Sequence, residues 1–244
     1  MIMPGIADFE TVQRWHCPRF LESPLATNGV VDGNPVHEES MAIAKMMPQH
    51  FIVDVTLSGA NVITGVFAGD MELAWREGVA FAANHLKAPI EALADIVVTS
   101  SAGFPLDLTF YQTVKGMVGA MPAVKRGGTI IIVSACTEGI GSPAFTKTLL
   151  EAGELQAFVE RISAPDVFEP EEWQVEELAK ASRHAEIVLV TDGLSANVVS
   201  SCHVRPASSF DAALHYAYSK HGADASIIAI PRGPYVIPAC VQKS

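Results

Sequence analysis

Four short apolar runs in the second half of the chain constrain its fold more than any other feature. They are rich in isoleucine and valine, and they cover residues 96–99, 129–133, 187–190 and 226–230. None of them alternates apolar with polar residues, as a strand with one solvent-exposed face would. Strands of this kind are buried on both faces, which is typical of a parallel sheet.

Segments with helical patterns separate these runs. They cover about 108–120, 144–162, 171–185 and 209–221, and Gly153 marks a break in the second of them. An alternation of buried strands with helices predicts a parallel α/β fold with right-handed crossovers. We therefore expect a mainly parallel sheet with flanking helices in residues 94–244. The pattern does not fix the order of the strands.

Residues 1–90 follow a different pattern. Asp8 is suited to cap a first helix, and Pro35 is suited to the first position of a second helix. Residues 51–57 then alternate, and a turn leads to residues 62–67. These features predict a smaller α/β part that contains a β-hairpin.

The change of pattern falls between residues 87 and 93. We therefore expect two units, a smaller α/β part in residues 1–90 and a larger α/β domain in residues 91–244.

Charge and composition exclude several classes of protein. The formal net charge of -11 argues against a nucleic-acid surface, which needs clustered lysine and arginine. The longest apolar stretch, residues 129–133, is far shorter than the ~20 residues that cross a bilayer. The cysteines form no C-x-x-C pair and no disulfide framework; they are Cys17, Cys136, Cys202 and Cys240. We therefore expect a cytoplasmic protein that binds neither nucleic acid nor membrane.

Three polar, glycine-containing loops follow the first three predicted strands. They cover residues 100–107, 136–142 and 192–197. In an open parallel sheet, ligands bind outside the carboxyl ends of the strands, so these loops are candidates for a ligand site. The alternative is that they are ordinary connections between strands and helices.

The helix predicted after the first loop carries Tyr111, Gln112 and Lys115. Gln112 and Lys115 share one face of the helix, and Tyr111 lies beside them. Helical side chains lean toward the amino end of their helix, which directs Lys115 toward the end of the preceding strand. There a lysine and an amide could hold a carboxylate or a hydroxyl group. The alternative is a solvated lysine on an amphipathic helix.

His16, on the first predicted helix, is a candidate metal ligand, because imidazole is the commonest protein ligand for metals such as nickel and zinc. The alternative is a packed or surface histidine beside Trp15. No second ligand pair stands at the spacing that a zinc site requires.

The residues that carry these candidates resemble a known family. Residues 100–107 have the sequence SSAGFPLD, and residues 111–117 have the sequence YQTVKGM. Together they are similar to the G-[YF]-P-L-D and Y-Q-x-x-K-G-M signature of the nickel-dependent lactate racemase family. The Pro-Gly-Ile at residues 4–6, with His16 after it, is similar to the cofactor-tether segment of that family. The match extends over essentially the whole chain.

The resemblance implies a role for each candidate. His16 would ligate the nickel of a pincer nucleotide. Gln112 and Lys115 would bind a small 2-hydroxy-acid substrate, with Tyr111 beside them, and Trp173 would correspond to an active-site tryptophan. The implied reaction is racemisation by reversible hydride transfer between the carbon that bears the hydroxyl group and the cofactor. A pair of histidines would act as acid and base on the hydroxyl group.

The sequence also departs from the family. The lysine that tethers the cofactor lies just before the segment that opens here, and no lysine precedes Pro4. The acid/base histidines and the phosphate-binding motifs belong to an amino-terminal half that this sequence lacks. We therefore expect a carboxy-terminal portion that alone binds no cofactor and is inactive. A shortened polypeptide, a start codon assigned too late, and a subunit whose partner carries the other half all remain open.

Apolar surface that such a half would cover should favour self-association, so a homo-oligomer is expected. The alternative function is a non-catalytic module on the same scaffold, which binds small acids or another protein.

Overall fold

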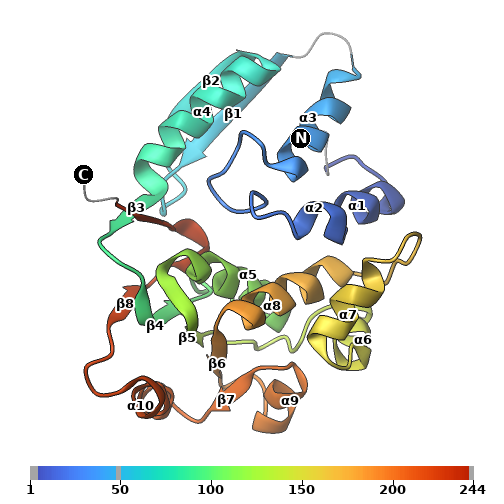
Figure 1. Ribbon diagram of the computed structural model, residues 1–244. Helices are drawn as coiled ribbons and strands as arrows, with labels where there is room; N and C mark the ends of the chain where they lie inside the picture. The colour runs from blue at the N-terminus through green and yellow to red at the C-terminus, as the bar shows by residue number, and fades with distance from the viewer. Residues whose placement is uncertain (1–4, 48–50, 242–244) are drawn as a thin grey trace.

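The second half of the chain forms a five-stranded parallel sheet (Figure 1). The computed structural model describes residues 5–47 and 51–241. The strand order is β7-β6-β5-β4-β8. The strands are β4 (Ala94–Ser100), β5 (Val124–Val133), β6 (Glu186–Val190), β7 (Arg205–Ala207) and β8 (Ile227–Ile230). All four predicted apolar runs are confirmed as parallel strands, and β4 and β5 are interior strands.

The strand β7 was not predicted, because it is short and contains Pro206. A proline cannot donate to a strand ladder, and it is tolerated at an edge such as this one.

Helices cover both faces of the sheet. They are α5 (Phe110–Ala120), α6 (Pro143–Glu151), α7 (Leu155–Ile162), α8 (Glu172–His184), α9 (Ala196–Ser201) and α10 (Phe210–His221). Successive side chains of a strand point to opposite faces. Ile130 and Ile132 therefore pack into the larger core with α5 to α9, whereas Ile131 packs with Ala213 of α10. The predicted break at Gly153 is confirmed, because its φ of +71° separates α6 from α7.

The first part of the chain is built from helices and a hairpin, as predicted. The helices are α1 (Phe9–Trp15), α2 (Pro18–Leu21), α3 (Pro35–Lys45) and α4 (Met71–Leu86), and the antiparallel hairpin consists of β1 (Phe51–Leu57) and β2 (Ile63–Asp70). Asp8 caps α1, since its carboxylate accepts a hydrogen bond from the Thr11 amide at 2.8 Å. Asn34 caps α3 in the same way through the Val36 amide at 3.1 Å.

The apolar face of the hairpin points to solvent. Val55 and Val66 are opposite each other in the register, and their exposed fractions are 46% and 61%. The other face packs on α4, where the buried ring of Phe67 lies 5.5 Å from that of Phe81. One helix covers only one side of a two-stranded sheet. The uncovered side forms an apolar surface, called the hairpin patch below, of Phe51, Val53, Val55, Leu57, Ile63 and Val66.

Two short parallel strands connect the first part of the chain with its end. They are β3 (Lys87–Ile90) and β9 (Ile237–Cys240), and they form a separate sheet. The short helical turns η1 (Met121–Ala123) and η2 (Gly233–Tyr235) lie beside α5 and β9. The predicted division into residues 1–90 and 91–244 stays a prediction.

Among residues 5–47 and 51–241, none of the helices combines the length and the apolar character that crossing a bilayer requires.

Candidate functional site

The three predicted loops meet at the carboxyl edge of the sheet. The loop after β5 is joined to the loop after β4, since the Cys136 amide donates to the Asp107 carbonyl at 2.7 Å. The amide of Tyr111 donates to the carbonyl of Ile140 at 2.8 Å. The loop after β6 joins them, because the Thr191 hydroxyl donates to the Ala135 carbonyl at 2.9 Å. The expected cluster of polar loops is therefore present.

Non-glycine residues with strained backbones lie in these loops and at the start of α8. Ala102, Cys136 and Glu171 have φ values of 66°, 49° and 56°, in the region that side chains rarely adopt. Such residues concentrate at functional sites, where the surrounding structure holds them in place.

A glycine brings α5 close to the end of β4. A Cβ atom added to Gly116 would lie 3.1 Å from the Ser100 carbonyl oxygen and 2.9 Å from the Ile132 side chain. Close approach of this kind requires a residue without a side chain. Gly116, the glycine of the K-G-M sequence, therefore lets α5 pack closely on β4 and β5. This packing positions the neighbouring Lys115.

Four of the five candidate residues form one chain of contacts. The Trp173 indole nitrogen donates a hydrogen bond to the Tyr111 hydroxyl at 3.0 Å. The ring of His16 lies 5.4 Å from that of Trp173, and the amine of Lys115 lies 5.9 Å from the centre of the Tyr111 ring. The structure thus brings together residues of α5 and α8 with His16, which caps the carboxyl end of α1.

Gln112 lies on α5 beside this chain of contacts. Its side-chain oxygen is buried and has no hydrogen-bond partner within the described part of the protein. A buried acceptor without a partner is costly, so this oxygen is suited to accept a hydrogen bond from a ligand.

The imidazole of His16 makes a hydrogen bond through one of its two ring nitrogens. Its Nδ1 donates to the Val12 carbonyl at 3.0 Å, which leaves the lone pair of Nε2 free. Burial lowers the pKa of His16, which favours the neutral ring that metals require. In residues 5–47 and 51–241, no three or more His, Cys, Asp or Glu side chains are gathered to hold a metal. His16 thus offers one imidazole ligand.

The polar heads at the site are partly desolvated. Burial lowers the pKa of the Lys115 amine and raises the pKa of the Tyr111 hydroxyl. Both shifts favour the neutral forms of these groups. An anion that approached Lys115 would reverse its shift, because a nearby negative charge favours the protonated amine.

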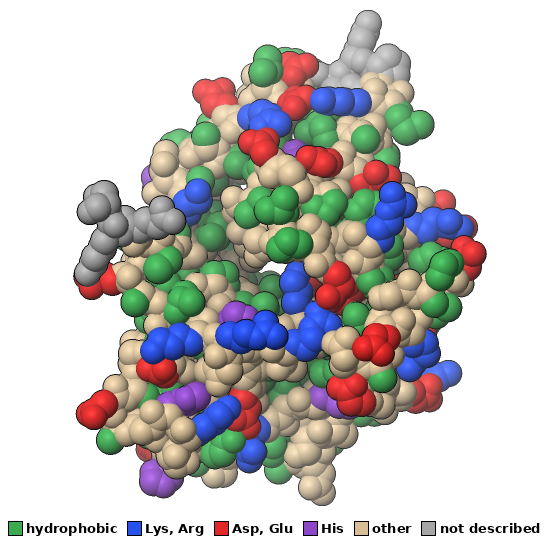
Figure 2. All heavy atoms as spheres, viewed as in Figure 1, with side chains coloured by type: hydrophobic (Ala, Val, Ile, Leu, Met, Phe, Trp, Pro, Cys, Tyr) green, Lys and Arg blue, Asp and Glu red, His purple; other side chains and the backbone are tan. Residues whose placement is uncertain are grey.

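A cavity of about 520 Å³ lies beside Trp173, and sequence reasoning did not predict it. Phe9 and Val12 of α1 line one side, and Ser142 and Glu171 line the other. The Glu171 carboxylate accepts hydrogen bonds from the Ser142 hydroxyl and from the Phe145 amide at the start of α6. No local pattern relates these segments, because only the packing of α1 on α8 brings them together. Figure 2 shows a hollow between the two parts of the molecule, with hydrophobic and basic side chains around it.

A second cavity, of about 650 Å³, lies at the amino ends of β5, β6 and β7, far from these residues. Its cations Arg205 and Lys220 already pair with Glu186, at 2.9 and 2.8 Å. Three helices end there, and their carboxyl ends repel an anion. The carboxyl edge of the sheet is therefore the candidate site.

The parallel sheet and the polar loops at its carboxyl edge define an α/β protein with a candidate ligand site at that edge. Residues 90–238 match the model of the lactate racemase C-terminal domain family. The chain belongs to that family, so the resemblance of its P-L-D and Y-Q-x-x-K-G-M sequences is confirmed.

Two lactate racemases are similar in sequence to most of this chain. It is 34% identical over 238 residues to a lactate racemase of Thermoanaerobacterium thermosaccharolyticum and 32% identical to one of Lactiplantibacillus plantarum. Each match covers 97% of this chain and 56% of the relative, so the chain spans about half the length of the curated relatives it matches.

Solved structures agree with this assignment. The lactate racemase apoprotein of the same Thermoanaerobacterium species is 33% identical and superposes with a TM-score of 0.92, covering 97% of this chain and 57% of that protein. A protein of Thermotoga maritima is 12% identical and superposes with a TM-score of 0.61. That match covers 85% of this chain and 54% of the Thermotoga protein, and it shows a shared fold alone. In the Pro-Gly-Ile segment that resembles the cofactor tether, Pro4 lies outside the described residues.

Proposed function

We propose that this chain supplies the carboxy-terminal part of a cytoplasmic, nickel-dependent racemase of lactate or a related 2-hydroxy acid. The observation that carries the proposal is the contact chain of His16, Trp173, Tyr111 and Lys115. In this chain, the imidazole of His16 contacts Trp173, and the amine of Lys115 contacts Tyr111. A metal ligand and a carboxylate-binding group are two of the protein functions that such a reaction needs at one site.

Each residue has a role in substrate binding. The Lys115 amine binds the substrate carboxylate, for which its three donors are suited. Gln112 binds the substrate beside Lys115, through a side-chain oxygen that has no hydrogen-bond partner among the described residues. The Tyr111 ring limits where the Lys115 amine lies, and the Trp173 indole holds the Tyr111 hydroxyl.

His16 holds nickel through Nε2, while the Val12 carbonyl fixes the orientation of its ring. A nickel pincer nucleotide would be held through its metal by His16 and would supply the chemistry of reversible hydride transfer at the substrate carbon. Proton transfer at the substrate hydroxyl is assigned to the part of the family's polypeptide that this chain does not span. In this proposal, catalysis needs that part together with the residues of this chain.

The proposed partner of this chain is the amino-terminal part of the family's polypeptide. Contiguous apolar surface marks interaction sites, and the hairpin patch is such a surface. The chain by itself self-associates through this patch.

A second candidate function is a non-catalytic module that binds small acids. The observation that favours it is that Lys115 and Gln112 lie on one helix, α5, and that the buried side-chain oxygen of Gln112 has no partner among the described residues. Binding of lactate to the purified chain in the absence of nickel would support this function.

The test of the racemase proposal uses the enzyme restored by combining this chain with the family's amino-terminal part. Lys115→Ala is expected to lower kcat/KM about tenfold or more, which corresponds to ~1.5 kcal/mol of transition-state binding. Lys147→Ala is the matched control, because Lys147 is an exposed lysine on α6 and should not affect the rate. Unchanged racemisation by Lys115→Ala would contradict the assignment.

Intact-mass spectrometry tests the chain alone. We expect the mass of the unmodified polypeptide. A covalent adduct of nucleotide size with bound nickel would show that the chain carries the cofactor without its partner.

A further inference from the structure

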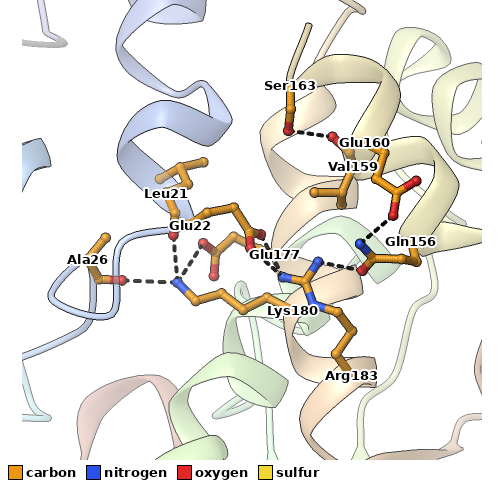
Figure 3. Close-up of polar contacts among 10 residues, drawn as sticks. All are labelled: Leu21, Glu22, Ala26, Gln156, Val159, Glu160, Ser163, Glu177, Lys180 and Arg183. Atoms are coloured by element: carbon orange, nitrogen blue, oxygen red, sulfur yellow. Dashed lines mark hydrogen bonds and ion pairs between the residues drawn. The ribbon is translucent and has the colours of Figure 1, made fainter.

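The segment that follows His16 is held on α8 by a lysine (Figure 3). The Lys180 amine donates to the backbone carbonyls of Leu21 at 2.9 Å and Ala26 at 3.2 Å. It also lies 3.6 Å from the Glu177 carboxylate. One side chain thus joins both ends of a short loop to α8, across more than 150 residues of sequence.

Arg183, nearly one turn further along α8, adds a second attachment. It donates to both carboxylate oxygens of Glu22, at 2.6 and 2.8 Å, and to the Gln156 side chain of α7 at 3.1 Å. The side chains of Arg183 and Glu22 are about one third exposed, so solvent weakens this pair. The Lys180 side chain is only 19% exposed, and it binds two backbone carbonyls besides the carboxylate of Glu177.

The held segment has little structure of its own. The helix α2 within it has four residues, far fewer than the ~12 residues that an isolated helix needs in water. Its buried side chains, Pro18 and Leu21, give it a small apolar contact surface. Its position therefore depends on tertiary contacts such as those of Lys180.

Trp173 and Lys180 lie seven residues apart on α8, which is about two turns and ~10 Å along one face. Trp173 contacts the ring of His16, and Lys180 contacts the backbone of Leu21 and Ala26. The same helix face therefore touches both ends of the segment from His16 to Ala26. Fixing one end restricts where the other can lie.

We propose that Lys180 is a positioning residue, which anchors the 21–26 loop on α8 and thereby keeps His16 against Trp173. The anchoring itself is independent of the proposed function. Only its purpose, to place a metal ligand at the substrate site, rests on that function.

Hydrogen–deuterium exchange on the full chain tests the anchoring. Lys180→Met keeps the aliphatic stem and removes the donor. Amides in residues 17–27 are expected to exchange about tenfold faster in this variant, while amides in β4, β5 and β6 keep their wild-type rates. Lys180→Arg, which can still donate to two carbonyls, should restore slow exchange. Lys220→Met is the matched control, because its amine binds Glu186 in the other layer of the domain.

Fluorescence quenching tests the consequence for Trp173. In a Trp15→Phe, Trp75→Phe background, Trp173 is the remaining tryptophan of the three in the chain. Lys180→Met should then make its emission at least twofold more sensitive to acrylamide, because His16 and Phe9 no longer cover its ring.

Three results would overturn the proposal. Unchanged exchange in residues 17–27 would show that Lys180 anchors nothing. Faster exchange throughout the sheet, or failure of Lys180→Met to fold, would make Lys180 a residue of general stability. Faster local exchange with unchanged quenching of Trp173 would show that the anchoring of the loop does not determine the position of His16. Each outcome is independent of racemisation by Lys115→Ala, so the failures of the two proposals are distinguishable.

Discussion

The Trp173 indole nitrogen donates a hydrogen bond to the Tyr111 hydroxyl at 3.0 Å, although 62 residues separate them in the sequence. This bond joins α8 to α5. The ring of Trp173 also lies 5.4 Å from the ring of His16, on the first part of the chain. Trp173 is therefore the residue at which three distant segments of the candidate site meet.

This bond should be measurable by a double-mutant cycle of Trp173→Phe and Tyr111→Phe. Each single variant removes the hydrogen bond, so the double variant should lose less stability than the sum of the two. We expect a coupling free energy of about 0.5–1.5 kcal/mol, measured by urea unfolding. Additive effects would mean that the bond contributes nothing.

Gly116→Ala should destabilise the protein by about 1–3 kcal/mol, although alanine is the better helix former. The reason is that the new methyl group would meet the Ser100 carbonyl and the Ile132 side chain. Gly59→Ala is the control, since its methyl group would meet only the flexible end of Arg232. Thermal unfolding of both variants checks the prediction, and equal stability would contradict the close packing of α5 on β4.

Glu176→Gln should make stability less dependent on pH. Burial, with smaller effects from Glu22 and Glu177, raises the pKa of Glu176 from 4.5 to about 9, and neither carboxyl oxygen has a partner within the described residues. The folded protein therefore keeps a proton that the unfolded chain releases, so wild-type stability falls as the pH rises from about 4.5 toward 9.

Because glutamine does not titrate, the advantage of Glu176→Gln should be absent near pH 4 and grow by up to ~1.4 kcal/mol per pH unit between pH 5 and 8. Urea unfolding at several pH values measures it. Glu160→Gln, at an exposed position of α7, is the control for the substitution itself. Parallel curves for Glu176→Gln and the wild type would show that Glu176 is ionised in the folded protein.

Replacing Val55 and Val66 together with threonine should reduce self-association of the chain. Threonine keeps the shape and the strand preference of valine but lowers the apolar area of the hairpin patch. Both side chains are exposed, so the melting temperature should change little. Light scattering as a function of concentration tests this prediction, and unchanged association would place the contact elsewhere.

Part of the candidate site could be predicted from local sequence. The spacing of Tyr111, Gln112 and Lys115 places them together on one helix, and that helix is present as α5. The contact between His16 and Trp173 has no local basis, because α1 and α8 meet only through tertiary packing. The resemblance named both residues, and the structure shows that their rings are adjacent.

The sequence by itself determined four of the five strands of the parallel sheet, all except β7. Runs such as residues 129–133 offer no polar face to solvent, so they are stable only where both faces are buried. Capping residues and the break at Gly153 likewise fixed where helices begin and end, because these preferences act within a few residues.

Only the tertiary structure decided which segments lie together. It paired β3 with β9, left the apolar face of the hairpin uncovered, and placed the Lys180 amine on the carbonyls of Leu21 and Ala26. Each of these depends on contacts between residues far apart in the sequence. A local pattern specifies which face of an element is apolar, but the partner that covers that face depends on how the whole chain packs.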